Sequence, residues 1–248
     1  MQVQLFPITL IEAFMLSPKV KHFIFQADKI PPFNYIAGQF ITIHFERDSK
    51  LLKRSYSIAN VPNQDNRIEF AAGYVENGPG TELLFNLKPG DIININGPFG
   101  RLVLKEELPK RYILAATSTG ITPYRAMLQE LTKRLKQNPD LKILLMLGVQ
   151  RPEDALYEQE FLAFAKAYPN QVTFRVQLSR ANDTNLESNQ FKGYIQHAFP
   201  EITLDPAQDL VYLCGNPGMI DACFEELKTR GFVMQQIIRE KYISGNTK

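Results

Sequence analysis

The chain has 248 residues, of which 44% are hydrophobic and 22% are charged, and its formal net charge is +2. This length suits one large domain or two smaller ones, and the ordinary composition excludes a disordered or fibrous chain. The mild charge excludes the strongly basic classes of nucleic-acid-binding protein, so we expect no nucleic-acid partner.

The sequence shows no signal for export or for a membrane. The N-terminus lacks a basic region followed by an apolar stretch and a cleavage site. The longest apolar runs, such as residues 143–149, are too short to span a bilayer. Cys214 and Cys223 are the only cysteines, too few to ligate an iron–sulfur cluster, and they fit a reducing compartment. We therefore expect a cytoplasmic chain without stable membrane insertion.

Residues 3–104 show the pattern of short strands separated by turns. Ile41, Ile43 and Phe45 alternate with polar residues, as in a half-buried strand. Pairs of proline and glycine separate the strands. Strands this short and closely spaced predict an antiparallel barrel or sandwich. The predicted strands are residues 22–27, 39–45, 55–59, 68–75 and 91–96.

After Pro109 strands alternate with helices. The strands are continuously apolar, which is typical of a parallel sheet covered on both faces. Gly231 is predicted to cap the helix before it. We place the boundary between residues 104 and 110, giving domains 1–106 and 107–248. The predicted strands are residues 112–116, 141–149, 172–178, 210–214 and 235–240, and the predicted helices are 123–137, 153–168 and 217–230.

Three polar segments follow predicted strands of the second half, at the edge where parallel sheets bind ligands. They are residues 116–123 (ATSTGITP), residues 213–219 (LCGNPGM) and the pair Ser179-Arg180. Glycine and hydroxyl groups let backbone approach an anion, and arginine donates a planar fork to phosphate. Each segment has a plainer interpretation, namely an ordinary turn, a packed thiol at Cys214, or a solvated loop arginine.

The first half contains two further unusual segments. Arg54-Ser55-Tyr56-Ser57 places a cation, a phenol and two hydroxyls on a predicted strand, where they are poor cover for a core. Residues 77–81 (NGPGT) precede an apolar stretch and resemble a phosphate-binding turn at the start of a short helix, or a plain loop. The three histidines show no metal-ligand spacing, so we expect no metal site. No nucleophile elbow or P-loop occurs, so a bound cofactor is expected to carry the chemistry.

The order of these segments is more specific than any one of them. Residues 37–40 (AGQF), RSYS at 54–57, residues 80–81, GPFG at 97–100, STGITP, Ser179-Arg180, CGNPGM and a Glu-Lys-Tyr ending extend over nearly the whole chain. In this order the chain resembles the ferredoxin–NADP⁺ reductase family. The resemblance implies an antiparallel FAD-binding β-barrel followed by a Rossmann-like NADP-binding α/β domain.

The resemblance also implies roles for the residues of the first half. Arg54 would pair with the FAD pyrophosphate, Tyr56 would lie against the flavin ring, and Ser57 would direct its hydroxyl at flavin N5. Gly80 and Thr81 would complete the pyrophosphate site. The remaining FAD positions are Ile58, Gly73 and Tyr242.

In the second half the resemblance assigns Cys214 to the border of the nicotinamide and Ser179 with Arg180 to the 2′-phosphate of NADP(H). Tyr194 would pack on the adenine, and Glu240 would contact the flavin from the other side. Ser57, Cys214 and Glu240 are thereby implied to be catalytic. The remaining NADP positions are Thr119, Gly120, Gln196, Gly215, Asn216, Pro217 and Met219.

Three residues or segments depart from the family pattern. Ser118 stands where the family commonly has the first glycine of a GTG triplet. Gln150 replaces an arginine that often follows the second strand of the α/β domain, which removes one phosphate contact. Residues 243–248 follow Tyr242, so the aromatic is not the last residue here.

The implied reaction is hydride transfer between NADP(H) and FAD, with single electrons passed to or from ferredoxin or flavodoxin. Two other activities remain open, a reductase component of a multicomponent oxygenase and an NAD(P)H:flavin reductase. A regulatory subunit that binds FAD without turnover is a further alternative, against which Cys214 and Ser57 argue. We expect a monomer.

Overall fold

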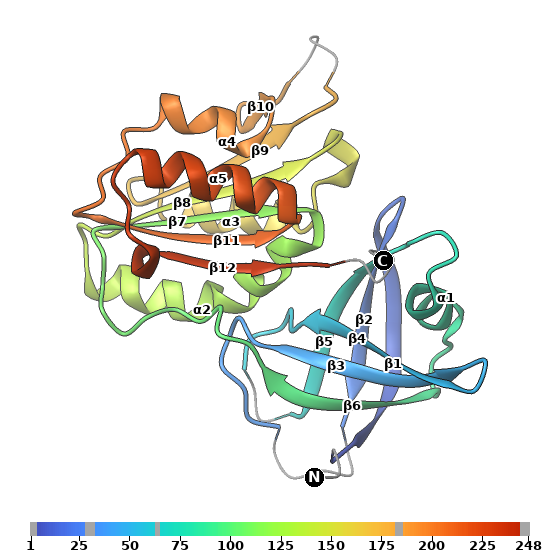
Figure 1. The fold of residues 1–248 in the computed structure, drawn as a ribbon. Coiled ribbons are helices and arrows are strands. Elements are labelled where there is room, and N and C mark those ends of the chain that lie inside the picture. Colours follow the sequence, from blue (N-terminus) through green and yellow to red (C-terminus); the bar gives the residue numbers. More distant parts are fainter. Residues whose placement is uncertain (1–3, 28–32, 63–64, 182–185, 244–248) are drawn as a thin grey trace. The chain divides into compact units, whose positions relative to one another are not determined.

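The structure is a computed structural model that describes residues 4–27, 33–62, 65–181 and 186–243. The chain divides into two compact units (Figure 1). Unit 1 consists of Met1–Leu104 and Thr122–Met127, and unit 2 of Lys105–Ile121 and Leu128–Lys248. The predicted division between residues 106 and 107 stays a proposal.

Unit 1 is a six-stranded antiparallel sheet with the strand order β4-β3-β6-β1-β2-β5. An isolated bridge between Ile58, just past β4, and Phe70 of β5 links the two edges of the sheet, so the sheet curls toward a barrel. This confirms the predicted antiparallel barrel. Helix α1 spans Pro79–Asn86. The strands are β1 Phe6–Ser17, β2 Val20–Gln26, β3 Phe40–Arg47, β4 Lys50–Ser57, β5 Arg67–Gly73 and β6 Ile92–Phe99.

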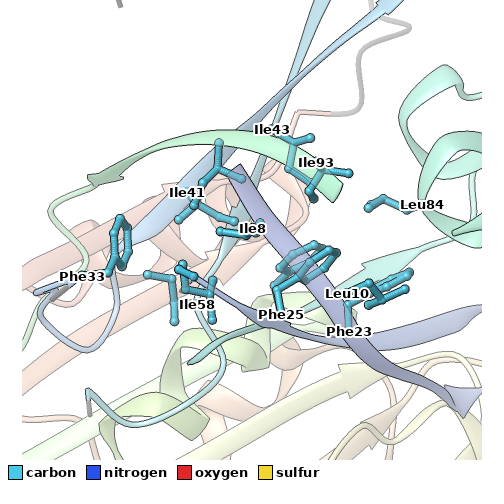
Figure 2. Close-up of a cluster of buried hydrophobic side chains, with 14 of the residues drawn as sticks. Ile8, Leu10, Phe23, Phe25, Phe33, Ile41, Ile43, Ile58, Leu84 and Ile93 are labelled. Atoms are coloured by element: carbon cyan, nitrogen blue, oxygen red, sulfur yellow. The ribbon is translucent and has the colours of Figure 1, made fainter. Parts of the chain in front are cut away.

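The core of unit 1 is aromatic and β-branched (Figure 2). Phe25 stacks on Phe70 with ring centroids 5.4 Å apart, and both side chains are fully buried. Ile41 and Ile43 are also buried, at 0% and 1% exposure, as the alternation along this segment predicts. Aromatic pairs of this kind stabilise a core beyond the area that they bury.

A tight hairpin sets the register between β3 and β4. Asp48 and Ser49 are its two loop residues and both have positive φ, at 52° and 57°, as in the type I′ turns that match strand twist. The register that follows pairs Ile43 with Arg54 and Ile41 with Tyr56. Because residues paired across two strands share a face, Arg54 and Tyr56 lie on the same face of the sheet as the buried isoleucines.

Unit 2 is a six-stranded parallel sheet in the order β10-β9-β8-β7-β11-β12, as expected from the strand–helix alternation. Figure 1 shows helices on both of its faces. The strands are β7 Arg111–Thr117, β8 Lys142–Val149, β9 Val172–Leu178, β10 Gln190–Lys192, β11 Asp209–Gly215 and β12 Ile237–Lys241. The helices are α2 Thr122–Gln137, α3 Glu158–Ala167, α4 Ile195–Ala198 and α5 Pro217–Thr229.

One face of this sheet is covered by α4 and α5, through a cluster that includes Met146 of β8, Ile195 of α4 and Ile220 of α5. The other face is covered in part by α3, since Phe161 stacks on Phe174 of β9 at 5.3 Å. Both cysteines are free and buried. Within the described ranges, no helix has the length and apolarity needed to cross a bilayer.

Several boundaries differ from the sequence prediction. The predicted helix 153–168 is wrong at its start, because Pro152–Asp154 forms a separate 3₁₀ turn and α3 begins only at Glu158. The residue before it, Tyr157, has φ 55°, which interrupts a continuous helix. The predicted cap at Gly231 is confirmed, with φ 88° directly after the C-cap residue Arg230.

Candidate active site

The polar residues of β4 lie against the start of α1 in unit 1. A Cβ atom on Gly80 would lie 2.7 Å from Cγ of Arg54 and 3.5 Å from the Tyr56 hydroxyl, so a side chain there would displace Arg54. The N-cap residue of α1 is Gly78, which has no side chain to accept hydrogen bonds from the first N–H groups of the helix. This arrangement leaves a cation, a phenol and backbone donors together, which suits a phosphate group.

Thr81 holds the turn before α1 together. Its hydroxyl accepts a hydrogen bond from the Val75 backbone N–H at 3.2 Å and lies 3.0 Å and 3.1 Å from the carbonyl oxygens of Val75 and Gly78. The side chain is 7% exposed. Its hydroxyl therefore shapes the glycine turn that the sequence analysis assigned to pyrophosphate.

Tyr56 is held as a neutral phenol. Its ring stacks on Phe70 with the centroids 5.0 Å apart. Burial raises the pKa of Tyr56 to about 12, and the charge of Arg54 opposes part of that rise. Arg54 itself donates from Nη1 to the Lys53 carbonyl oxygen at 2.7 Å, which uses one of its five N–H groups. Arg54 can therefore bind an anion while Tyr56 packs as an uncharged ring.

Ser57 and Ile58 occupy different surroundings from these two residues. Ser57 is 4% exposed and pairs with Phe40, on the opposite face of β4 from Tyr56. Ile58 is fully buried in the core, and its N–H donates to the Gln39 carbonyl oxygen at 3.0 Å. The FAD contact assigned to Ile58 therefore does not involve an exposed side chain.

A second site of close backbone approach lies in unit 2, where β7 and β11 end. A Cβ on Gly120 would overlap the Cys214 carbonyl oxygen and lie 2.9 Å from Cα of Gly215. Gly215 has φ 118°, and a Cβ there would lie 2.5 Å from Oγ1 of Thr117. Glycine is thus required at both positions by space, and at Gly215 also by conformation.

Thr117 links these two loops, a role that the sequence analysis missed. Its Oγ1 accepts a hydrogen bond from the Asn216 backbone N–H at 2.8 Å. Asn216 in turn caps α5, because its Oδ1 accepts from the N–H groups of Gly218 and Met219 at 2.8 Å and 3.2 Å. A threonine at the last position of an apolar strand is the one signal that could have identified this link.

Cys214, Glu240 and Tyr242 come together beside these loops. Cys214 pairs in register with Glu240 on β12, and the Tyr242 N–H donates to the Gly215 carbonyl oxygen at 2.8 Å. Burial raises the pKa of the Cys214 thiol well above its ordinary value, the Glu240 charge adds to the rise, and a hydrogen bond with Tyr242 opposes it. Cys214 is therefore a neutral thiol and not a thiolate nucleophile.

The carboxyl ends of β9 and β10 carry the residues assigned to the 2′-phosphate and the adenine. The backbone N–H groups of Ser179 and Arg180 donate to the carbonyl oxygens of Val149 and Gln150 at 3.0 Å and 2.9 Å. The Arg180 side chain is exposed. Tyr194 is 56% exposed beyond the end of β10. A cation, a hydroxyl and an accessible aromatic ring therefore lie along one edge of the sheet.

The remaining residues predicted for the cofactor sites lie in turns, at element ends or in the core. Ser118, where the family commonly has glycine, has φ 47°, a left-handed conformation that glycine adopts without strain. Met219 is 8% exposed and belongs to the core under α5. Thr119 lies in the 3₁₀ turn before α2, Pro217 begins α5, and Gly73 ends β5. Among the residues that the structure describes, no three His, Cys, Asp or Glu side chains are grouped to hold a metal ion.

Comparison with known families matches both units. The model of the oxidoreductase FAD-binding domain matches residues 7–104, and that of the oxidoreductase NAD-binding domain matches residues 114–225. The chain therefore carries an FAD-binding domain and an NAD(P)-binding domain.

Individual relatives agree with these family matches. The chain is 30% identical to a ferredoxin–NADP reductase of Azotobacter vinelandii, over 83% of each chain. It is 27% identical to the phenol 2-monooxygenase reductase component DmpP of a Pseudomonas strain, over 92% of this chain and 62% of that one. A crystal structure of a ferredoxin NADP⁺ reductase from Neisseria gonorrhoeae with bound FAD and NADP shares the fold, with a TM-score of 0.84 at 21% identity, over 98% of this chain and all of that one.

Proposed function

This chain belongs to the ferredoxin–NADP reductase family, and from that premise we propose that it transfers hydride between NADP(H) and FAD and exchanges single electrons with ferredoxin or flavodoxin. The bound flavin supplies the conversion between a two-electron donor and one-electron acceptors. The protein supplies binding, orientation and charge, as the contacts in each unit indicate.

In unit 1 the chain holds the dinucleotide by its pyrophosphate. Arg54 provides the charge, and the start of α1 at Gly80 provides backbone donors at a point with no side chain in the way. Tyr56, neutral and stacked on Phe70, offers a flat surface for the flavin ring. Ser57 is proposed to hydrogen-bond flavin N5.

In unit 2 the chain positions the nicotinamide with backbone and a neutral thiol. Gly120 and Gly215 let the two loops pack backbone against backbone beside the Cys214 carbonyl oxygen, and the hydrogen bond between Thr117 and Asn216 joins them. The Cys214 thiol packs without bringing a charge to the site, because its pKa is raised. Orientation of this kind can contribute greatly to rate, since hydride transfer requires the reacting atoms about 3–3.5 Å apart.

One observation supports the proposed selectivity for NADP(H) over NAD(H). Arg180 projects an exposed guanidinium at the end of β9, next to Ser179 and on the same edge of the sheet as the exposed Tyr194. A 2′-phosphate binds such a guanidinium through charge-assisted hydrogen bonds, which NAD(H) cannot form.

Replacing Arg180 with alanine tests this selectivity. We expect kcat/KM for NADPH to fall by roughly 30-fold, because a charge-assisted bond contributes about 2 kcal/mol, while kcat/KM for NADH stays within about twofold. Lys166→Ala, which removes an exposed cation from the last turn of α3, is the matched control and leaves the ratio unchanged. An Arg180→Ala enzyme with the wild-type NADPH/NADH ratio would show that the 2′-phosphate binds elsewhere.

The electron acceptor is proposed to be a separate protein carrier, since the chain has only two cysteines and both are free. Ferredoxin or flavodoxin is favoured by the Azotobacter relative, and an oxygenase component is the second candidate because of the phenol 2-monooxygenase relative. Steady-state reduction of each carrier, and of free flavin, separates the three. A protein acceptor gives a rate that falls steeply with salt, and free flavin does not.

We also propose that the protein is a cytoplasmic monomer. Two buried free thiols support a reducing compartment. Size-exclusion chromatography with light scattering is expected to give the mass of one chain at micromolar concentration, and a concentration-independent dimer would contradict the proposal.

A further inference from the structure

Gln177 of β9 is a buried polar side chain that has no part in the sites above. It is 1% exposed. Among the residues that the structure describes, its Nε2 has no hydrogen-bond partner. Native interiors hold few unpaired donors because each one is costly. The unpaired donor of Gln177 therefore requires an explanation.

The register of the sheet places Gln177 beneath α4. Gln177 pairs with Gly148 of β8, and residues side by side in a parallel sheet share a face. A Cβ on Gly148 would lie 3.0 Å from Cδ1 of Ile195, the first residue of α4. Arg175, two residues before Gln177 and on the same face, pairs with Met146 of the cluster that packs against α4. The amide of Gln177 therefore lies on the face that α4 covers.

The surroundings of Gln177 on this face combine apolar groups with the Arg175 guanidinium, which pairs with Glu201 at 3.0 Å. On the other side it pairs in register with Phe191 of β10, and the Arg175 guanidinium lies over the Phe191 ring at 3.9 Å. Gly148 contributes no polar side chain on the β8 side. The Arg175 guanidinium is a donor and cannot accept from Gln177 Nε2.

The residue that follows Ile195 carries the complementary atom. Oε1 of Gln196 is buried and also has no partner among the described residues. It is an acceptor, whereas Nε2 of Gln177 is a donor, and the two belong to facing layers of unit 2. Tyr194, immediately before α4, is the exposed ring assigned to the adenine. A hydrogen bond between the two amides would satisfy both atoms at the adenosine edge of the site.

We propose that Gln177 is a positioning residue for the adenosine end of the nucleotide. When nucleotide is bound, Gln177 Nε2 donates to Gln196 Oε1, and this bond directs the Gln196 amide N–H toward the nucleotide beside Tyr194. The inference rests on the proposed function, because it takes the edge that holds Ser179, Arg180 and Tyr194 as the adenosine site.

The test is a double-mutant cycle in the full-length FAD-loaded protein, with adenosine 2′,5′-bisphosphate as the calorimetric ligand. Gln177→Met and Gln196→Met remove the two amides at nearly constant volume. We expect each to weaken binding roughly tenfold, and the double variant to weaken it by about the same tenfold, because both amides act through the one contact between Gln196 and the nucleotide. The melting temperature of the nucleotide-free Gln177→Met protein should be equal or higher, since an unpaired buried amide has been replaced by an apolar group.

Gln171→Met is the matched control. The Gln171 amide already donates to the carbonyl oxygens of Asn138 and Leu141 at 3.1 Å and 3.2 Å. Its loss should lower the melting temperature and leave affinity for the bisphosphate unchanged, the reverse of the Gln177→Met result.

Two results would overturn the inference: wild-type affinity in Gln177→Met, or losses that multiply to about a hundredfold in the double variant. Arg180→Ala, measured with the same ligand, separates this from a failure of the proposed function. If Arg180→Ala weakens binding and Gln177→Met does not, the positioning role alone is wrong. If Arg180→Ala binds like the wild type, the adenosine site itself has been misplaced.

Discussion

In unit 1 Arg54 and Tyr56, assigned to FAD, contribute side chains, whereas in unit 2 the loops assigned to the nicotinamide contribute mainly closely packed backbone. Arg54 and Tyr56 lie on β4, which pairs with β3 along its whole length. Gly120 and Gly215, in contrast, are surrounded by backbone atoms that tolerate no Cβ. The difference implies that the Arg54 site loses function when atoms are removed, whereas the nicotinamide loops at Gly120 and Gly215 lose it when atoms are added.

The largest expected effect comes from adding one methyl group in unit 2. Gly120→Ala places a Cβ against the Cys214 carbonyl oxygen and 2.7 Å from its carbon, so the backbone must move. We expect a loss of about 3 kcal/mol in unfolding free energy, at the upper end for overpacked sites, and NADPH binding too weak to saturate. Denaturant unfolding and NADPH titration measure the two effects. Gly218→Ala is the control, because a Cβ there meets only Oδ1 of Asn216 at 3.2 Å and should leave stability equal or higher.

The converse change in unit 1 is Arg54→Ala. We expect FAD affinity to fall by roughly 30-fold, corresponding to about 2 kcal/mol for a lost charge-assisted contact. The unfolding free energy of the FAD-free protein should change by less than about 0.5 kcal/mol. Fluorescence titration with FAD measures the affinity. Lys53→Ala removes the neighbouring exposed cation on the other face of β4 and should bind FAD normally. Equal losses in the two variants would mean that overall charge, and not the Arg54 position, attracts FAD.

A third prediction concerns a partly buried ionic group in unit 1 that no cofactor role explains. Glu69 accepts from Arg125 at 3.0 Å and lies 3.2 Å from His22 Nε2. Burial alone would raise the pKa of Glu69, but the hydrogen bonds with His22 and Arg125 lower it below its ordinary value. A lowered folded-state pKa stabilises the fold above the unfolded pKa of about 4.3, and this stabilisation is lost as pH falls through the lower folded-state value.

Glu69→Gln should therefore reduce the unfolding free energy by about 1.5 kcal/mol at pH 7 and flatten its decline below about pH 4.3. Chemical denaturation at several pH values measures both. Glu82→Gln, which breaks the more exposed pair with Arg47, is the control and should change stability by less than about 1 kcal/mol. An unchanged acid slope in Glu69→Gln would show that other carboxylates determine acid sensitivity.

The smallest expected effect is Ser118→Gly. Relief of the left-handed conformation is partly offset by the greater freedom of glycine in the unfolded chain. We expect stabilisation of about 0.5 kcal/mol, or a rise of about 1–2 °C in melting temperature. Thr119→Gly, at the next residue of the same turn, lacks this relief and should destabilise. If both variants lose stability equally, the Ser118 conformation carries no strain.

How much of this could be predicted from the sequence depended on the length and regularity of each pattern. The alternation around Ile41 and Ile43 and the strand–helix alternation after Pro109 gave the barrel and the parallel sheet, and the order of weak motifs gave the family. Strand β1 was not placed, because register shifts between Leu10 and Glu12 and between Met15 and Ser17 break its alternation. Elements as short as β10 and α4 leave no periodicity to find.

The candidate site was likewise predictable only in part. The order of the motifs identified the candidate residues, but it did not show which of them contact one another. The hydrogen bond between Thr117 and Asn216 joins two loops that are 99 residues apart in the sequence. The left-handed conformation of Ser118 could not be inferred from serine itself, because serine rarely adopts it. The unpaired amides of Gln177 and Gln196 depend on which face of the sheet α4 covers.

The hairpin of Asp48 and Ser49 has a consequence for how this sequence can vary. Because the loop contains two residues and side chains alternate along β4, its length determines which residues of the segment 54–57 point inward. Inserting or deleting one residue there would exchange Arg54 and Tyr56 for Ser55 and Ser57 on the inner face, even though every residue of the motif was retained. Insertions and deletions in this turn should therefore be as rare among related sequences as substitutions in the motif. A peptide inserted into the turn would be tolerated only if it preserves the pairing of Arg47 with Lys50.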